Sequence, residues 1–256
     1  MIHRLLAGIA GLAVLAVAAW GIVSSMSGLP RFSPRSGFIS ELAVPWNPYA
    51  GRLNESFVAG GVLIVLFAAA STTRARSGRG RLAGLLTAAA GMGVLFVGVF
   101  PLTSPWLHLI GALAAGLCAL VAGVVGASAA RRAARANRDN PLLGIGSALA
   151  LALGLLAVAA ALGAVGYTAW ISAGVGVHSL DALFRALPRA LRVDWHGHVY
   201  NPVAVLEWIF FAVLGLELGG FAVAELSGLA DRARQSHPST PAEPRSAFAE
   251  DDRIVG

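Results

Sequence analysis

Arg74-Ala-Arg76-Ser-Gly-Arg79-Gly-Arg81 separates two long apolar segments of this chain, and Arg131-Arg132-Ala-Ala-Arg135-Ala-Asn-Arg138 separates the next two. An apolar segment of about 20 residues can cross the hydrocarbon core of a bilayer as a helix. Short loops rich in Lys and Arg between such segments stay on the cytoplasmic side of the membrane. The alternation therefore predicts an all-α integral membrane protein with both arginine clusters inside the cell.

The composition agrees with a membrane protein. Hydrophobic residues make up 57% of the chain and charged residues only 12%, whereas a soluble domain of this length needs far more charge to cover its surface. The net charge of +6 comes from Arg alone, because the chain has no Lys. Most of these arginines flank apolar segments, so they indicate membrane orientation and contact with anionic lipids, not a nucleic-acid surface. An Arg-only chain rich in Ala, Gly and Leu is also typical of a bacterial protein.

The apolar segments define the expected architecture. Those long enough to span a bilayer are Leu5–Ser24, Glu55–Thr72, Leu82–Phe100, Trp106–Ala127, Leu142–Tyr167 and Val203–Leu226. With the arginine clusters inside, this bundle of six transmembrane helices has both its N-terminus and its C-terminus in the cytoplasm. We expect residues 1–230 to form the membrane domain and residues 231–256 to form a disordered cytoplasmic tail. The first segment is too long for a signal peptide, so we expect it to be retained.

Two features of the segments concern packing and the outer surface. In the fourth segment, small residues recur every four positions and predict close packing against another helix of the same chain: Gly111, Ala115, Ala119, Gly123 and Ala127. Two long stretches, 26–54 and 168–202, are expected outside the cell. The second contains a candidate interfacial helix between residues 180 and 191.

Three acids lie in the last apolar segment. Glu207 is about 6 Å from the outer boundary, where a helix N-terminus favours an acid. Glu217 lies about 20 Å along the helix, in the inner half of the membrane, so it must be protonated or meet a polar partner. Thr87 and Ser147 are candidate partners at similar depth. Glu225 lies at the inner rim, where we expect it to be solvated.

The topology also predicts a polar cluster at the outer face. Its members are Ser40, Glu41, Asn54, His108 and Glu207, of which Asn54 is expected in the first outer loop. The last outer loop adds further polar residues: His178, Asp194, His196, His198 and Asn201. Such groups can bind a divalent metal or a polar lipid headgroup. The histidine spacing matches no zinc motif, so no metal set is predicted.

Sharper chemical motifs are absent from the sequence. It contains no Walker loop, no His-Glu-x-x-His, no Gly-x-Ser-x-Gly and no Cys-x-x-Cys-His. The lone Cys118 lies inside an apolar segment and excludes an internal disulfide. The sequence therefore indicates no cofactor and no catalytic residue.

Short motifs along the chain resemble the bacterial and archaeal membrane family called domain of unknown function 998. They are Ser40-Glu41-Leu42, Asn54, Gly60-Gly61, Gly98-Val-Phe-Pro101 followed by His108, and Glu207. The resemblance spans about Leu5–Leu226 and implies six helices, an outer-face cluster of Glu41, Asn54, His108 and Glu207, and a relationship to the Frag1/DRAM/Sfk1 group. The family pattern commonly has Glu-Arg where this chain has Glu207-Trp208, so an ion pair with that arginine is in doubt here.

These observations favour a non-enzymatic role. We expect a lipid-interacting or accessory protein of the bacterial inner membrane, with a polar pocket at the extracytoplasmic face. Membrane lipids are the expected partners and nucleic acid is not, while other membrane proteins or a second copy of the chain stay open. One alternative is a metal-assisted hydrolase or lipid-modifying enzyme that uses Glu41, His108 and Glu207. Another is a small transporter subunit with Glu217 as its protonatable site.

Overall fold

The computed structural model describes residues 2–75, 77–101, 104–136, 193–195 and 198–236, with isolated residues between 148 and 173. Within these residues, 5 helices are long and apolar enough to cross a membrane. They are α1 (Ile2–Met26), α2 (Ala50–Thr72), α3 (Gly78–Val99), α4 (Pro105–Ala136) and α7 (Pro202–Ser236). The expected all-α membrane architecture is confirmed at this level. The expected segment Leu142–Tyr167 and the helix near residues 180–191 lie largely outside the described residues.

Several helices extend beyond the apolar segments that predicted them. Helix α2 begins at Ala50, so Asn54 lies in a helix and its expected position in the outer loop is wrong. Helix α4 continues through Ala136 and includes the first residues of the second arginine cluster. Helix α7 continues through Ser236, past the expected end of the membrane domain at residue 230. A helix can extend beyond the bilayer because each added turn satisfies its own backbone hydrogen bonds.

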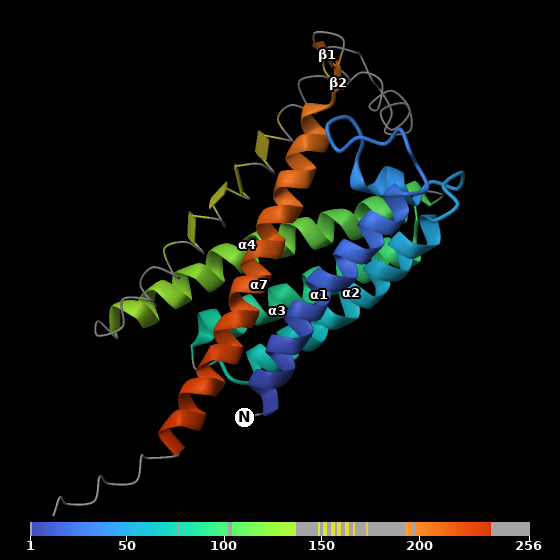
Figure 1. Cartoon of the computed structure of the whole chain (residues 1–256). Coiled ribbons are helices and arrows are strands. Elements are labelled where there is room, and N and C mark those ends of the chain that lie inside the picture. The colour runs from blue at the N-terminus through green and yellow to red at the C-terminus, as the bar shows by residue number, and fades with distance from the viewer. Residues whose placement is uncertain are drawn as a thin grey trace, which may run out of the picture.

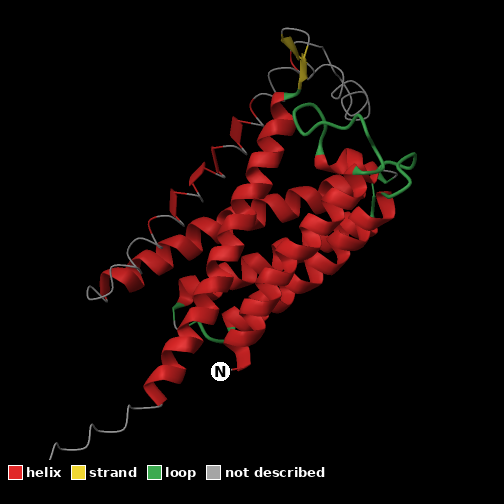
Figure 2. Ribbon diagram, viewed as in Figure 1, coloured by secondary structure: helices red, strands yellow, loops and turns green. Residues whose placement is uncertain are grey.

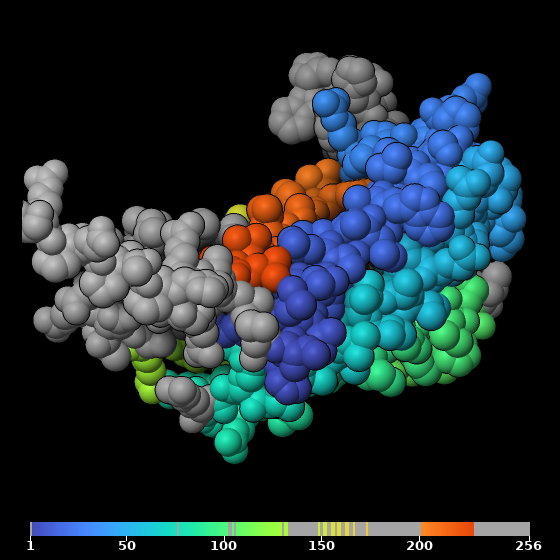
Figure 3. All heavy atoms as spheres, turned by 60° about the horizontal axis from the view of Figure 1, so that its bottom comes forward, coloured from blue at the N-terminus to red at the C-terminus, as the bar shows by residue number. Residues whose placement is uncertain are grey.

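Neighbouring helices pack in chain order, and α7 returns to α1. The contacts join α1 to α2, α2 to α3, α3 to α4 and α1 to α7. Figure 3 shows α7, α1 and α2 side by side across one face of the molecule. Glycines allow close approach: a Cβ on Gly61 would lie 2.7 Å from the Gly91 carbonyl oxygen, and one on Gly93 would lie 2.5 Å from the Ala115 nitrogen. Helix backbones are therefore nearly in contact at these positions, as small residues permit in a membrane.

The ridge of small residues on α4 is buried at its two ends, Gly111 and Ala127, and half-buried between them. Gly111 faces α3, because a Cβ there would lie 3.1 Å from the Gly93 carbonyl oxygen. Gly123 faces Glu217 of α7, and Ala127 is fully buried. Leu117, which lies off the ridge, is 60% exposed. The ridge therefore serves two helices, α3 near the start of α4 and α7 farther along.

The connection between α1 and α2 covers one end of the bundle, which we call the outer end (Figures 1 and 2). It contains a short 3-10 helix, η1 (Ile39–Ala43), whose apolar residues pack with Leu53 of α2. Met26, Phe57 and Trp208 pack against this group, so three long helices share one small core here. The connection is therefore part of the folded bundle.

A short hairpin precedes α7. Strands β1 (Val193–Trp195) and β2 (His198–Tyr200) are antiparallel, with Trp195 opposite His198. Asp194 and His198, expected in the last outer loop, are thus strand residues of this hairpin. The two strands of a hairpin form backbone hydrogen bonds with each other. A polar segment next to a membrane helix can therefore satisfy its own backbone groups.

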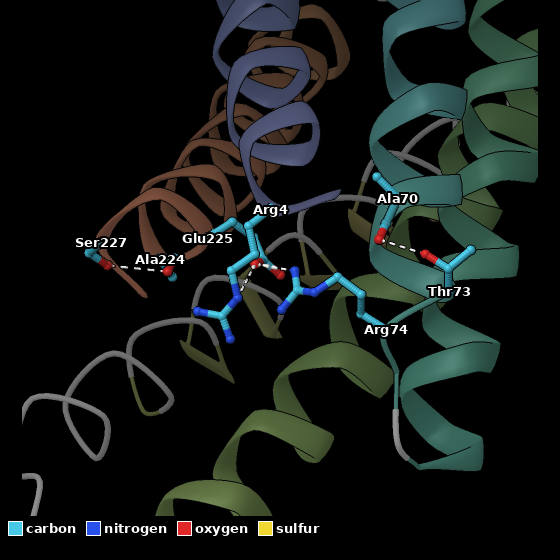
Figure 4. A network of polar contacts seen from close by, with 7 residues as sticks. All are labelled: Arg4, Ala70, Thr73, Arg74, Ala224, Glu225 and Ser227. Carbon is cyan, nitrogen blue, oxygen red and sulfur yellow. Dashed lines mark hydrogen bonds and ion pairs between the residues drawn. The ribbon is translucent and has the colours of Figure 1, made fainter. Parts of the chain in front are cut away.

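At the other end of the bundle, which we call the inner end, ion pairs join three segments. Glu225 of α7 forms ion pairs with Arg74, after α2, and with Arg4 of α1, at 3.8 Å (Figure 4). The expectation that Glu225 is merely solvated is therefore wrong. Opposite charges at a partly buried helix end attract one another more strongly than in bulk water.

Candidate functional site

Residues 35–39, which we call the outer strap, lie against the first turns of α7. The backbone N–H of Asn201 donates to the Arg35 carbonyl at 2.8 Å, and Trp208 Nε1 donates to the Gly37 carbonyl at 3.0 Å. The Ile39 N–H donates to Glu207 Oε2 at 3.0 Å. These three hydrogen bonds join residues that are remote in sequence. They place the Glu207 carboxyl beneath the strap.

Asn201 sets the start of α7. Its side-chain Oδ1 accepts hydrogen bonds from the N–H groups of Val203 at 3.1 Å and Ala204 at 3.2 Å. Asn is among the preferred residues at this position because it satisfies N–H groups that a helix leaves unpaired at its N-terminus. Asn201 is fully buried, and its Nδ2 has no hydrogen-bond partner among the described residues. The sequence placed Asn201 among the outer polar residues, and the structure makes it a helix cap.

Asn47 joins the segment between α1 and α2 to the end of α1 by hydrogen bonds. It is absent from the predicted cluster. Its Nδ2 donates to the carbonyls of Ser25 at 3.0 Å and Leu42 at 2.6 Å, and its Oδ1 accepts from the Tyr49 N–H at 3.0 Å. Gly28 is required nearby, since a Cβ there would lie 2.1 Å from Asn47 Oδ1. The sequence did carry a clue, because Asn before Pro favours a turn.

Glu41 is an acid that interacts with Glu207 in the described site. The two carboxyls are close enough to interact electrostatically, although they belong to η1 and α7. Ser40 is half-buried beside Glu41 in the same 3-10 helix. Two carboxyls repel each other when both are ionised, and a cation or a cationic group would reduce that repulsion.

Asn54 of α2 and His108 of α4 both lie near the outer end of the neighbouring helix α3. A Cβ on Gly98 of α3 would lie 2.7 Å from the Asn54 carbonyl oxygen, which shows how closely α2 and α3 approach. Asn54 Oδ1 is buried and has no hydrogen-bond partner among the described residues. The His108 ring is buried, with Nδ1 3.0 Å from the Phe100 carbonyl oxygen. A carbonyl can only accept, so Nδ1 carries the hydrogen in this contact.

The outer-face cluster as a whole stays a prediction. Glu41 and Glu207 meet beneath the strap, and Asn54 and His108 lie where α3 ends. His178 and His196 lie outside the described residues. Within the described ranges, no three residues of the His, Cys, Asp and Glu types are placed to hold a metal ion together.

Glu217 is a second polar position, deeper in the bundle. It is 7% exposed, and its Oε1 is buried with no hydrogen-bond partner among the described residues. Its Oε2 lies against α4, where a Cβ on Gly123 would be 2.7 Å away. Thr87, an expected partner, donates its hydroxyl to the Ala83 carbonyl at 2.9 Å. The other expected partner, Ser147, lies outside the described residues.

Comparison with known proteins gives one family and no individual relative. Residues 6–183 match the family model described as Protein of unknown function (DUF998). Neither the curated proteins nor the solved structures contain a match to the chain. The matched region includes Glu41, Asn54 and His108 but ends before Glu207, so it is shorter than the resemblance in the sequence suggested. Because the match covers most of a chain whose helices are apolar and of membrane length, this multi-pass membrane protein belongs to the DUF998 family.

Proposed function

We propose that the chain is a non-enzymatic, lipid-interacting or accessory protein of the bacterial inner membrane, with a polar site at the extracytoplasmic face. In this proposal six helices cross the membrane, both termini are cytoplasmic, and the family is related to the Frag1/DRAM/Sfk1 group. The observation that carries the proposal is the position of Glu207. It lies beside Glu41 beneath the outer strap, at one end of an apolar bundle.

Exposed aromatic residues support a membrane interface at this level. Trp20, Trp46, Tyr49 and Trp106 lie near the outer end and are 50%, 76%, 37% and 45% exposed. Trp and Tyr gather where lipid headgroups meet the hydrocarbon, because their rings are apolar and their edges polar. The Arg52 guanidinium lies 4.2 Å from the centre of the Tyr49 ring, an arrangement that holds both side chains at the surface. The two acids would therefore meet lipid headgroups and not lipid tails.

The charge of the site indicates which headgroup it suits. Glu41 and Glu207 are both acids, so their mutual repulsion falls when a cationic group binds between them. A carboxylate offers about four acceptor positions, and the Ile39 N–H occupies one of those on Glu207. The primary ammonium of an ethanolamine headgroup has three donors and matches these acceptors. We therefore propose an amine-bearing lipid as the ligand class.

Lipid retention by the purified full chain tests this proposal. Native mass spectrometry would compare phosphatidylethanolamine with phosphatidylglycerol bound to the wild type, Glu207→Gln and Glu41→Gln. Glutamine keeps an acceptor for the Ile39 N–H, so Glu207→Gln should stay folded. We expect each variant to lose phosphatidylethanolamine about fivefold, close to 1 kcal/mol, with phosphatidylglycerol unchanged.

Glu225→Gln is the matched control, because it removes an acid of the same helix at the inner end. Its retention of both lipids should equal that of the wild type. Equal phosphatidylethanolamine retention by the wild type and both outer variants would refute the proposed site.

A further inference from the structure

We propose that Glu217 and Gly123 form an intramembrane site at the contact of α4 and α7 that takes up and releases one proton. This site is separate from the proposed lipid site. Glu207 lies near the start of α7, whereas Glu217 lies almost three helical turns farther along, within the apolar span Pro202–Ser227.

The first support is the way the carboxyl is enclosed. Glu217 is among the few buried polar or charged residues of the described bundle, and its Oε1 is one of the few buried polar atoms there without a hydrogen-bond partner. Its Oε2 faces the α4 backbone at the position where Gly123 has no side chain. A glycine at this position leaves room for a carboxyl tip that any larger residue would displace. Helix α4 is thus shaped to receive this acid.

The second support is the apolar character of the described residues of α3, α4 and α7 that pack above and below the site. On α4, Gly116 faces Phe210, and Gly126 faces Phe221 and Ala83. Leu15 of α1 lies against Gly215 and Gly219, on the face of α7 turned away from Glu217, so α1 brings no charged group to the carboxyl from this contact.

The described polar side chains at a depth similar to Glu217 either form hydrogen bonds within their own helices or lie on another helix face. Thr87 of α3 donates to its own helix, and Ser128 of α4 donates to the Val125 carbonyl at 2.8 Å. Cys118 is the titratable residue of α4 nearest in sequence to Gly123, and helical spacing places it on a different face. Among the described residues, the ion pairs of the bundle involve Glu225 and not Glu217. Binding of a proton is therefore the event that can remove its charge within this surrounding.

A proton fits the site better than a metal cation does. Sodium-like or divalent cations require several oxygen ligands around them. Helices α4 and α7 are continuous here, so their carbonyls accept hydrogen bonds within the helix and do not turn toward Glu217. A proton needs a single carboxyl oxygen. An ionised carboxyl in the hydrocarbon region is costly, so protonation would decide whether α4 and α7 can stay in contact at this point.

Reaction with an apolar carbodiimide tests the proposal. Such a reagent enters the membrane and attaches to protonated carboxyls. The full chain in liposomes would be treated between about pH 5 and pH 9, a window that covers carboxyl titration in proteins, and the label at Glu217 would be measured by peptide mass spectrometry. We expect labelling that falls about tenfold per pH unit above a single midpoint.

Two other results would overturn the proposal. Equal labelling at every pH would show a permanently protonated acid with a structural role. Absence of label at every pH would show a carboxyl whose oxygen is held by another group. Glu207→Gln should leave the Glu217 titration unchanged, so failure of the lipid proposal and failure of this one are distinguishable.

A pair of glycine variants tests the part played by α4. Gly123→Ala would place a Cβ against Oε2, and we expect the midpoint of labelling to move by at least about half a pH unit, which corresponds to roughly threefold. Gly116→Ala is the matched control, since its Cβ would meet Phe210 at an ordinary 3.9 Å. Equal midpoints in the two variants would remove Gly123 from the site.

Discussion

The two ends of helix α7 hold their acids in different ways. Near the outer end, Glu207 accepts a hydrogen bond from a backbone N–H of the connection between α1 and α2. Near the inner end, Glu225 pairs with the guanidinium groups of Arg4 and Arg74. Hydrogen bonds to backbone groups have narrow geometric requirements, whereas ion pairs between long side chains tolerate several arrangements. The outer end is therefore held in a defined geometry, and the inner end is held by attraction between opposite charges.

A test of membrane orientation by thiol labelling should give the largest effect, since each position is either labelled or not labelled. Two variants in a Cys118→Ala background would each carry a single cysteine. Ser77→Cys lies near the inner end and Pro34→Cys near the outer end, and both native residues are exposed. Because the arginine-rich turn is expected in the cytoplasm, an impermeant thiol reagent added to intact cells should label only the cysteine at position 34. Labelling at position 77 instead would reverse the assignment of inner and outer ends.

Asn47→Ala should give the largest loss of stability at the outer end. The substitution removes three hydrogen bonds and takes the Asn47 donor from the buried carbonyls of Leu42 and Ser25, of which Ser25 keeps the Gly28 N–H. We expect a decrease of about 2–4 kcal/mol in the free energy of unfolding, measured by chemical denaturation in detergent. The neighbouring Trp46→Ala, at a 76% exposed position, should change it by less than about 0.5 kcal/mol. Similar losses in the two variants would show that Asn47 does not hold the connection in place.

Trp208→Phe isolates one hydrogen bond of the outer strap. Phenylalanine keeps much of the packing with the η1 core but cannot donate to the Gly37 carbonyl. We expect a loss of about 1 kcal/mol in thermal unfolding experiments, with little dependence on salt. A loss that disappears at high salt would contradict the view that neutral hydrogen bonds dominate this end.

Glu225→Gln should have the smallest effect, and the effect should depend on salt. The side chains of Arg4, Arg74 and Glu225 are 23–27% exposed, so solvent screens their attraction. We expect a loss below about 1 kcal/mol at low ionic strength that decreases toward zero at high ionic strength. The same measurement on the wild type should show the stabilisation declining with salt. An effect independent of salt would indicate that packing, and not charge, closes the inner end.

Local sequence properties were sufficient to predict the 5 membrane-length helices of the described residues. Each spanning helix needs only its own run of apolar residues, because its backbone hydrogen bonds close within the segment. The ridge around Gly111 was also visible, since small residues at helical spacing mark a face that a neighbour can approach. Boundaries were less predictable. Asn54 and the first residues of the second arginine cluster proved helical because a helix can continue beyond the apolar run.

Only the tertiary structure decided which polar groups meet. The sequence determined that Glu207, Glu217 and Glu225 lie on one helix at increasing depth, since depth follows from the rise per residue. Glu207 contacts Ile39, Glu217 lies against Gly123, and Glu225 pairs with two arginines. All these neighbours are remote along the chain. Those contacts depend on how each helix is rotated and on the path of the connections between helices. Neither property is encoded in one segment, because both result from packing several helices together at once.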